Sequence, residues 1–132
     1  MASAAQHLRV IPVLLMTGAI ITAASLPGKY QPALLHNGID KYAHALIYGM
    51  LAASYLFAFG ARLIRRFPVR ISLVTLIICL AYAVLEEIYQ SIIPGRRADI
   101  VDLEADMIGV LLVTLVWLAI LLKKNNRPPN TE

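Results

Sequence analysis

The chain has 132 residues, of which 59% are hydrophobic and only 15% are charged, and its formal net charge is +4. So few charged residues could not cover a soluble surface, and the mean hydropathy of +0.70 points the same way, so composition excludes a soluble domain. The net charge does not indicate nucleic-acid binding, because most basic residues flank apolar segments, as membrane topology requires. The single cysteine, Cys79, excludes a disulfide framework and a metal site built on cysteines.

Four apolar segments are each long enough to cross a hydrocarbon core about 30 Å thick, which takes a helix of about 20 residues. They cover residues 8–24, 44–61, 71–93 and 103–122. The predicted fold is an all-α integral membrane four-helix bundle that forms one domain over residues 1–122. Residues 123–132 are polar, and we expect them to form a disordered cytoplasmic tail.

The first of these segments also has features of a cleaved signal peptide. A basic residue, Arg9, precedes an apolar core, and the small residues 22–25 offer a cleavage point. The apolar core is long for a signal peptide and the region before it is weakly basic, so we expect a helix that stays in the protein. Cleavage would leave the orientation of the other three segments unchanged.

The distribution of lysine and arginine predicts the orientation of the bundle, because cytoplasmic loops of membrane proteins are enriched in both. With the amino terminus inside, eight basic residues lie on the cytoplasmic side and four on the outer side. The inner set is Arg9, Arg62, Arg65, Arg66, Arg70, Lys123, Lys124 and Arg127, and the outer set is Lys29, Lys41, Arg96 and Arg97. We therefore predict a multi-pass protein of the cytoplasmic membrane with both termini in the cytoplasm.

Polar residues interrupt the apolar segments in three places, and this orientation brings all three to the outer end of the bundle. Helix residues three or four apart lie on one face, so each group forms a stripe. The stripes are Asp40, Lys41, His44 and Tyr48 in the second segment, Glu86, Glu87 and Gln90 in the third, and Asp99, Asp102 and Asp106 at the start of the fourth. Ionisable groups inside a membrane need a partner and mark functional sites. The sequence therefore predicts a polar site at the outer membrane surface, completed by Arg96 and Arg97 in a loop.

Two of these stretches, DKYAHALIYGML and EEIYQSIIPGRRADIVDLEADMIG, resemble the VanZ-like family of small bacterial membrane proteins. The family pattern has Asp-Lys, His and Tyr in one helix, a Glu-x-x-Gln end of another, then Pro-Gly-Arg, an Asp, and an Asn three residues before a Gly. The matching residues are Asp40, Lys41, His44, Tyr48, Glu87, Gln90, Pro94, Gly95, Arg96, Asp102 and Gly109. At the Asn position this chain has Asp106, so an ionisable group replaces an amide. The resemblance implies a link to resistance against teicoplanin, a lipoglycopeptide antibiotic.

The resemblance also selects between two neighbouring glutamates. Adjacent helix residues point about 100° apart, so Glu86 and Glu87 do not face the same neighbours. Because the spacing from Glu87 to Gln90 matches the family pattern, Glu87 is the predicted site residue. Glu86 is expected to pair with an arginine or to be protonated.

The first functional hypothesis is a membrane-embedded enzyme that acts on a phosphate-bearing lipid or a lipid-linked cell-wall intermediate in the outer leaflet. The forked guanidinium suits phosphate, so Arg96 would hold it together with Lys41 and with help from Arg97. The remaining candidates for substrate binding are Asp40, Tyr48 and Gln90.

The catalytic part of this hypothesis assigns three residues. His44 and Glu87 would transfer protons or attack the substrate, and Asp102 would orient His44. The alternative is a binding or assembly module that recognises a headgroup, an envelope precursor or a drug without chemistry, so the sequence leaves enzymatic activity open. A third alternative, polar contacts that only hold helices together, is disfavoured because such bonds average about 0.6 kcal/mol each.

No diagnostic metal motif occurs, so no metal or other cofactor is expected. A divalent cation stays open as an alternative, because carboxylate oxygens are its preferred ligands. The carboxylates that could supply them are Glu86, Glu87, Asp102 and Asp106.

Overall fold

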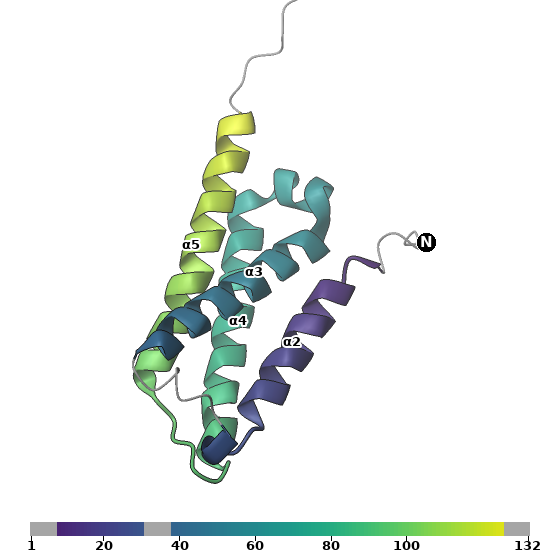
Figure 1. Ribbon diagram of the computed structural model, residues 1–132. Coiled ribbons are helices and arrows are strands. Elements are labelled where there is room, and N and C mark those ends of the chain that lie inside the picture. The colour runs from purple at the N-terminus through teal and green to yellow at the C-terminus, as the bar shows by residue number, and fades with distance from the viewer. Residues whose placement is uncertain (1–7, 31–37, 126–132) are drawn as a thin grey trace, which may run out of the picture.

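The computed structural model of the chain describes residues 8–30 and 38–125, and its regular elements there are four α-helices and one short 3-10 helix, η1 (Gly28–Tyr30). The α-helices are α2 (Ile11–Ala24), α3 (Ile39–Arg66), α4 (Pro68–Ser91) and α5 (Ile100–Asn125). They form an elongated bundle (Figure 1). The last three are long and apolar enough to cross a membrane, and α2 is a shorter apolar helix. The predicted all-α membrane fold is confirmed.

The helix ends differ from the predicted spans by a few residues. α2 has 14 residues and is about 21 Å long, and it begins at Ile11 because proline, here Pro12, favours the first turn of a helix. α5 starts three residues before the predicted span and ends three residues after it. The extension includes Lys123 and Lys124, whose charges are favourable at the carboxyl end of a helix. Of the predicted tail, residues 126–132 lie outside the described residues.

α3 is interrupted at Gly60, close to the predicted end of the second span. Gly60 has a φ of 77° and a ψ of 151°, a conformation that glycine adopts without steric strain. The guanidinium of Arg9 lies where a Cβ of residue 60 would be. Beyond this kink the chain turns back toward α4, which begins at Pro68 (Figure 1). The uninterrupted part of α3 therefore ends near the predicted boundary.

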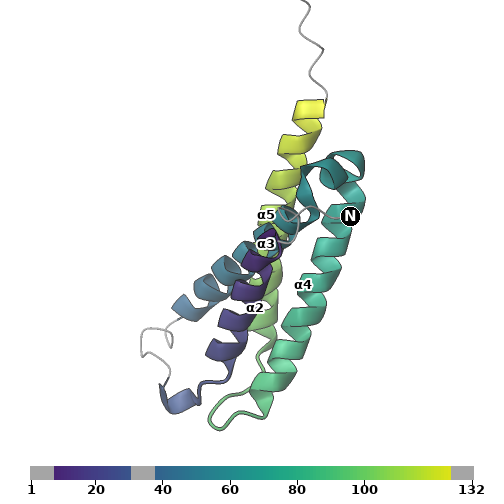
Figure 2. The same cartoon turned by 90° about the vertical axis from the view of Figure 1, so that its right-hand side faces the viewer.

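α3 and α5 pack against each other at a glycine contact. A Cβ on Gly109 would overlap the backbone carbonyl of Ala45, so a larger residue would push the helices apart. On the other side of α3, α2 packs against α3 and α4 (Figure 2). The main buried cluster lies between the helices and contains Ile20, Tyr48, Leu51, Ala52, Cys79, Ala83 and Val110.

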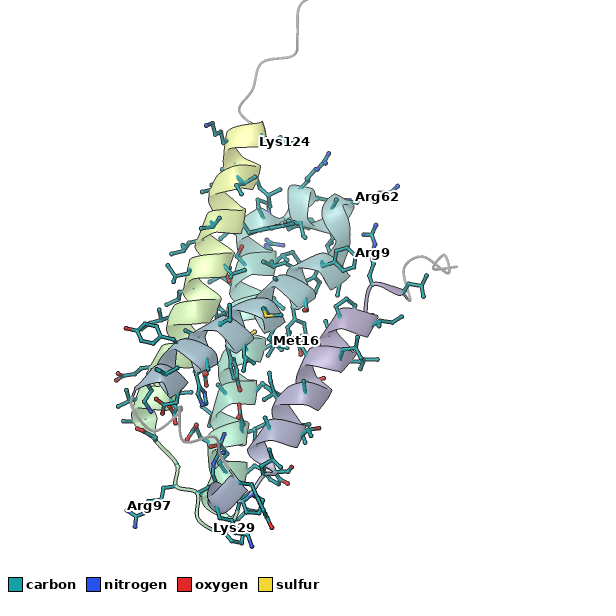
Figure 3. The ribbon with its side chains drawn as sticks, in the orientation of Figure 1. Arg9, Met16, Lys29, Arg62, Arg97 and Lys124 are labelled. Carbon is teal, nitrogen blue, oxygen red and sulfur yellow. The ribbon has the colours of Figure 1, made fainter. Side chains whose placement is uncertain are left out.

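The two ends of the bundle differ in charge. Arg9, Arg62 and Lys124 lie at one end, which we call the basic end, and Lys29 and Arg97 lie at the other (Figure 3). The second end also holds the α4–α5 loop and the start of α3, and we call it the polar end (Figure 1). The structure thus separates the two sets of basic residues as the sequence predicts, whereas the placement of the basic end in the cytoplasm stays a prediction.

Candidate functional site

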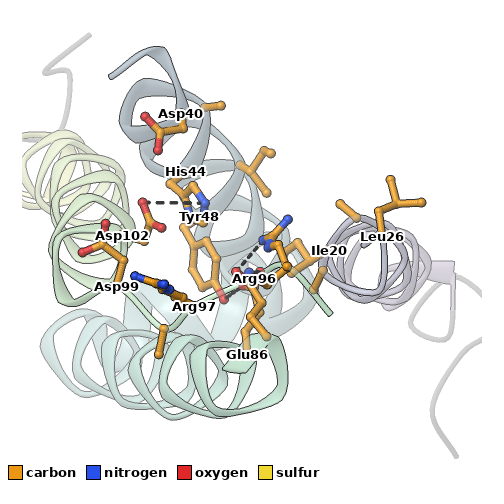
Figure 4. A pocket seen from close by; sticks show the side chains of 17 residues that line it. Ile20, Leu26, Asp40, His44, Tyr48, Glu86, Arg96, Arg97, Asp99 and Asp102 are labelled. Atoms are coloured by element: carbon orange, nitrogen blue, oxygen red, sulfur yellow. Dashed lines mark hydrogen bonds and ion pairs between the residues drawn. The ribbon is translucent and has the colours of Figure 1, made fainter. Parts of the chain in front are cut away.

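A cavity of about 800 Å³ lies at the polar end of the bundle (Figure 4). One wall is apolar and is built largely by α2. Its residues are Ile20, Ala23, Ala24, Leu26, Ala43 and Ile47. The remaining wall is polar and is formed by Asp40, His44, Tyr48, Glu86, Gln90, Arg96, Arg97, Asp99 and Asp102. The cavity therefore gathers all the predicted site residues except Lys41 and Glu87.

Lys41 lies in a cage of carboxylates beside the cavity. Its ammonium is 3.2 Å from Asp40 Oδ2 and 2.8 Å from Asp99 Oδ2, and it also binds Asp102 Oδ1. This ammonium lowers the pKa of Asp99, which lies in the loop between the membrane-spanning helices. The expectation that Lys41 holds a phosphate does not fit this geometry, because neighbouring carboxylates already compensate its charge.

His44 bonds to α5 through Asp106 and not through the expected Asp102. Nδ1 of the imidazole lies 2.9 Å from Asp106 Oδ1, whereas Nε2 lies 3.9 Å from Asp102 Oδ1, beyond hydrogen-bond range. The cause is competition, since the same Asp102 oxygen binds the ammonium of Lys41. In this geometry His44 is bonded to Asp106, and the role predicted for Asp102 in orienting His44 stays a prediction. Asp102 still faces His44 across the polar wall (Figure 4).

The two glutamates of α4 take positions opposite to those expected. Glu86 lines the cavity and accepts hydrogen bonds from the hydroxyl of Tyr48 at 2.5 Å and from the amide of Gln90 at 2.6 Å. Glu87 points toward the α4–α5 loop, where it accepts the backbone N–H of Asp99 at 2.7 Å. The angle of about 100° between adjacent helix residues sends only one of them to the cavity, and the rotation of α4 selects Glu86. The arginine pairing expected as one alternative for Glu86 is not seen among the residues that the structure describes, and its protonation stays a prediction.

Two arginines in the α4–α5 loop carry positive charge into the polar wall. Arg96 is half-buried and donates a hydrogen bond to the side-chain carbonyl oxygen of Gln90, which is itself 2% exposed. Arg97 is exposed at the rim, points away from the helix ends (Figure 3), and makes no ion pair with the residues that the structure describes. The Gln90 amide is neutral, so this hydrogen bond does not compensate the positive charge of the Arg96 guanidinium.

A glycine contact fixes the loop that carries these arginines. The backbone N–H of Gly28, at the start of η1, donates to the carbonyl oxygen of Pro94 at 3.1 Å. A Cβ on Gly28 would overlap the carbonyl of Gly95, so the two backbones meet without an intervening side chain. Gly95 also has a φ of 77°, which favours glycine at this turn. The contact holds Arg96 over the mouth of the cavity, between α2 and α4.

The acidic side chains are not arranged as a metal site. Across residues 8–30 and 38–125, no three His, Cys, Asp or Glu side chains form a group that could hold a metal ion. Asp102 binds Lys41, and Asp106 bonds to His44. The divalent cation that the sequence left open stays an expectation without a geometric counterpart in this part of the chain.

Sequence reasoning missed two contributions to the site. The sequence places Asp106 on the same stripe as Asp102, but spacing alone did not identify it as the partner of His44. The apolar wall from α2, with Ile20 and Leu26, had no signal, because an apolar helix looks the same whether it faces lipid or a cavity.

Comparison with known proteins agrees with the pattern of polar residues. The sequence model of the VanZ/LLP1 family matches residues 4–123, which is most of the chain. No curated protein and no solved structure matches the chain.

Proposed function

The chain belongs to the VanZ/LLP1 family, and we propose that it binds the phosphate-bearing headgroup of a lipid or lipid-linked envelope precursor from the outer leaflet. The headgroup would enter the cavity at the polar end, with its phosphate at Arg96. Recognition of a cell-envelope precursor at this site would also account for a role in resistance to glycopeptides such as teicoplanin.

The single observation that carries this proposal is the pairing of Arg96 with an amide. A buried or half-buried arginine is normally paired with a carboxylate, and acids are plentiful at this end of the bundle. Arg96 instead donates to Gln90, whose own amide group donates to Glu86. Gln90 thus lies between the guanidinium and the Glu86 carboxylate, and leaves a planar fork that matches two phosphate oxygens.

The apolar wall supports a lipid as the source of the phosphate. Ile20, Leu26 and Ile47 line the same cavity as Arg96, so a ligand held there meets apolar surface on one side and charge on the other. An amphiphile with a phosphate head and a hydrocarbon chain has this distribution of polarity. A free inorganic phosphate would leave the apolar wall without a partner.

Two roles for the site remain distinct. In an enzyme, His44 would handle the proton of a hydroxyl group, because it lines the cavity within the same polar wall as Arg96. The second candidate is a module that binds the headgroup without chemistry. The lining contains no Ser, Thr or Cys among the described residues, so covalent attack in an enzyme would fall to His44 or to a carboxylate such as Glu86.

A binding titration tests the proposal. Purified protein in mild detergent is titrated with dihexanoyl phosphatidic acid, with dihexanoylglycerol as the ligand that lacks phosphate. We expect saturable binding of the phosphate form only. In Arg96→Met the affinity should fall by about 10- to 100-fold, because a hydrogen bond to a charged group contributes about 1.5–3 kcal/mol.

Lys29→Met is the matched control, because Lys29 is an exposed basic residue at the same end that does not line the cavity. Equal affinity of the parent and Arg96→Met would contradict the proposal. Mass spectrometry of the ligand after incubation separates the two candidates, since a binding module returns it unchanged.

A further inference from the structure

We propose that Asp106 is a positioning residue that holds the proton of His44 on Nδ1, so that Nε2 faces the cavity as a proton acceptor. The inference rests on the proposed function, because the cavity ligand or its bound water would supply the proton. It adds a residue that family resemblance does not, since the family pattern has an amide at this position.

The geometry of the imidazole distinguishes its two nitrogens. Nδ1 is 2.9 Å from Asp106 Oδ1, which is hydrogen-bond distance, and Asp106 is fully buried in α5. A carboxylate can only accept, so the shared proton resides on Nδ1. A neutral imidazole then has a lone pair on Nε2, the nitrogen turned toward Asp102 and the polar wall of the cavity (Figure 4).

Asp102 does not compete for this nitrogen. Its Oδ1 is 3.9 Å from Nε2 and already binds the ammonium of Lys41. The Asp102 oxygen nearest to Nε2 therefore already has a partner. The Lys41 cage therefore leaves Nε2 available to a hydroxyl group in the cavity.

The helix backbones hold the pair in place. Ala45, which follows His44, touches Gly109 backbone to backbone, one turn beyond Asp106 on α5. Functional groups carried by rigid, closely packed helices are held to within a fraction of an ångström, as proton transfer requires. His44 and Asp106 therefore both lie beside a point where the backbones of α3 and α5 touch.

The second oxygen of Asp106 argues against a role in helix packing alone. Oδ2 is buried and has no hydrogen-bond partner among the residues that the structure describes. An unsatisfied buried oxygen opposes folding, and an apolar residue at this position would avoid that cost. A carboxylate at this position destabilises the fold, but its negative charge stabilises the imidazolium that forms when Nε2 accepts a proton.

Nitrogen NMR of the imidazole tests the assignment. The chain has three histidines, so His7→Gln and His36→Gln are combined to leave His44 as the only labelled side chain in protein grown with 15N-histidine. At neutral pH we expect the shift of a protonated nitrogen at Nδ1 and of a bare nitrogen at Nε2. A proton on Nε2, or on both nitrogens, would overturn the proposal.

Two variants complete the test. Asp106→Leu removes the acceptor and should abolish the preference for the Nδ1-protonated form, whereas Asp106→Asn offers a carbonyl oxygen and should retain it. Unchanged nitrogen shifts in both variants would overturn the proposal. If Asp106→Leu fails to fold, loss of the Nδ1 proton in Asp106→Asn would count equally against it.

Failure of this inference is distinguishable from failure of the proposed function. The parent is titrated with dihexanoyl phosphatidic acid beside the NMR measurement, so that binding and the tautomer are determined separately. A parent that does not bind the lipid phosphate would refute the proposed function and leave the NMR result to decide the tautomer. Binding combined with the wrong tautomer would refute the positioning role alone.

Discussion

The two ends of this bundle use charge in different ways. At the basic end, arginines and lysines are mostly exposed, and their recorded contacts are with aromatic rings, such as Arg9 over Phe57 and Arg66 over Phe67. At the polar end, acidic and basic side chains lie next to one another, and most are partly buried and hydrogen-bonded or ion-paired. Every acidic residue that the structure describes lies there, namely Asp40, Glu86, Glu87, Asp99, Asp102, Glu104 and Asp106.

The charged residues at the two ends have different roles. An exposed lysine or arginine contributes to membrane topology by its charge alone, so its neighbours matter little. Most charged groups at the polar end are paired with a group of opposite charge, so the removal of one leaves the other unpaired; Arg96 and Arg97 are exceptions. Substitutions of the paired charges should therefore have large effects on stability, and substitutions at the basic end small ones.

The largest effect on stability is expected for Lys41→Met. Without the ammonium, the carboxylates of Asp40, Asp99 and Asp102 face one another with no cation between them. Breaking a buried pair costs about 3–5 kcal/mol, and partial exposure reduces this to about 2 kcal/mol, or a fall of about 6–10 °C in melting temperature. Thermal unfolding in mild detergent measures it.

Arg62→Met, at the basic end, is the control and should change the melting temperature by no more than about 2 °C. A small change in Lys41→Met would mean that the acids do not depend on Lys41, and the contrast between the two ends would fail.

A smaller effect is expected for Tyr48→Phe. The hydroxyl of Tyr48 donates to Glu86 from a position that is 1% exposed, so its removal takes a donor from a half-buried carboxylate. Because Glu86 keeps the hydrogen bond from Gln90, the expected loss is about 1 kcal/mol in the free energy of unfolding. Tyr55→Phe, two turns further toward the basic end, should change it by less than about 0.5 kcal/mol. Equal losses would show that the Tyr48–Glu86 bond contributes no more than an ordinary tyrosine hydroxyl.

The smallest effect concerns pH. The ammonium of Lys41 lowers the pKa of Asp99 in the folded protein, so the resulting stability is present above the ordinary carboxyl pKa of about 3.9. It is lost as the pH falls through the lowered pKa. Because the Asp99 side chain is 43% exposed, solvent weakens the effect.

The parent should therefore lose slightly more melting temperature between about pH 6 and pH 3 than Asp99→Asn, by about 2 °C or less. Glu104→Gln, which changes an exposed acid near the same end, should follow the parent. A larger acid sensitivity in Asp99→Asn than in the parent would reverse the sign and contradict the role of Lys41.

The sequence was sufficient for the fold and for the location of the site, but not for its pairings. The lengths of the apolar segments predicted the membrane spans, and residue spacing placed His44, Gln90 and Asp102 on polar stripes at one end of the bundle. Spacing does not fix the rotation of a helix about its axis, which decides between neighbours such as Glu86 and Glu87. Nor does it show which acid a base will choose when several lie within reach, and this is why Asp106 was not predicted as the partner of His44.

The apolar wall of the cavity was unpredictable for a different reason. Ile20 on α2 and Leu26 just after it line the cavity, but apolar residues that face lipid and apolar residues that face a cavity are of the same types. Only the packing of α2 against α3 and α4 distinguishes them.

The most direct test of the account compares melting temperatures of the parent, Arg96→Met and Arg62→Met, each with and without dihexanoyl phosphatidic acid at about ten times the dissociation constant of the parent. We expect the ligand to stabilise the parent and Arg62→Met by about 1.4 kcal/mol, or about 5 °C, and Arg96→Met by about 0.4 kcal/mol or less, because its affinity is at least about 10-fold weaker. Without ligand, Arg96→Met should melt at or above the parent, as expected when a residue serves binding and not folding. If Arg96→Met melts several degrees lower and gains as much from the ligand as the parent, the polar end is a packing contact and not a binding site.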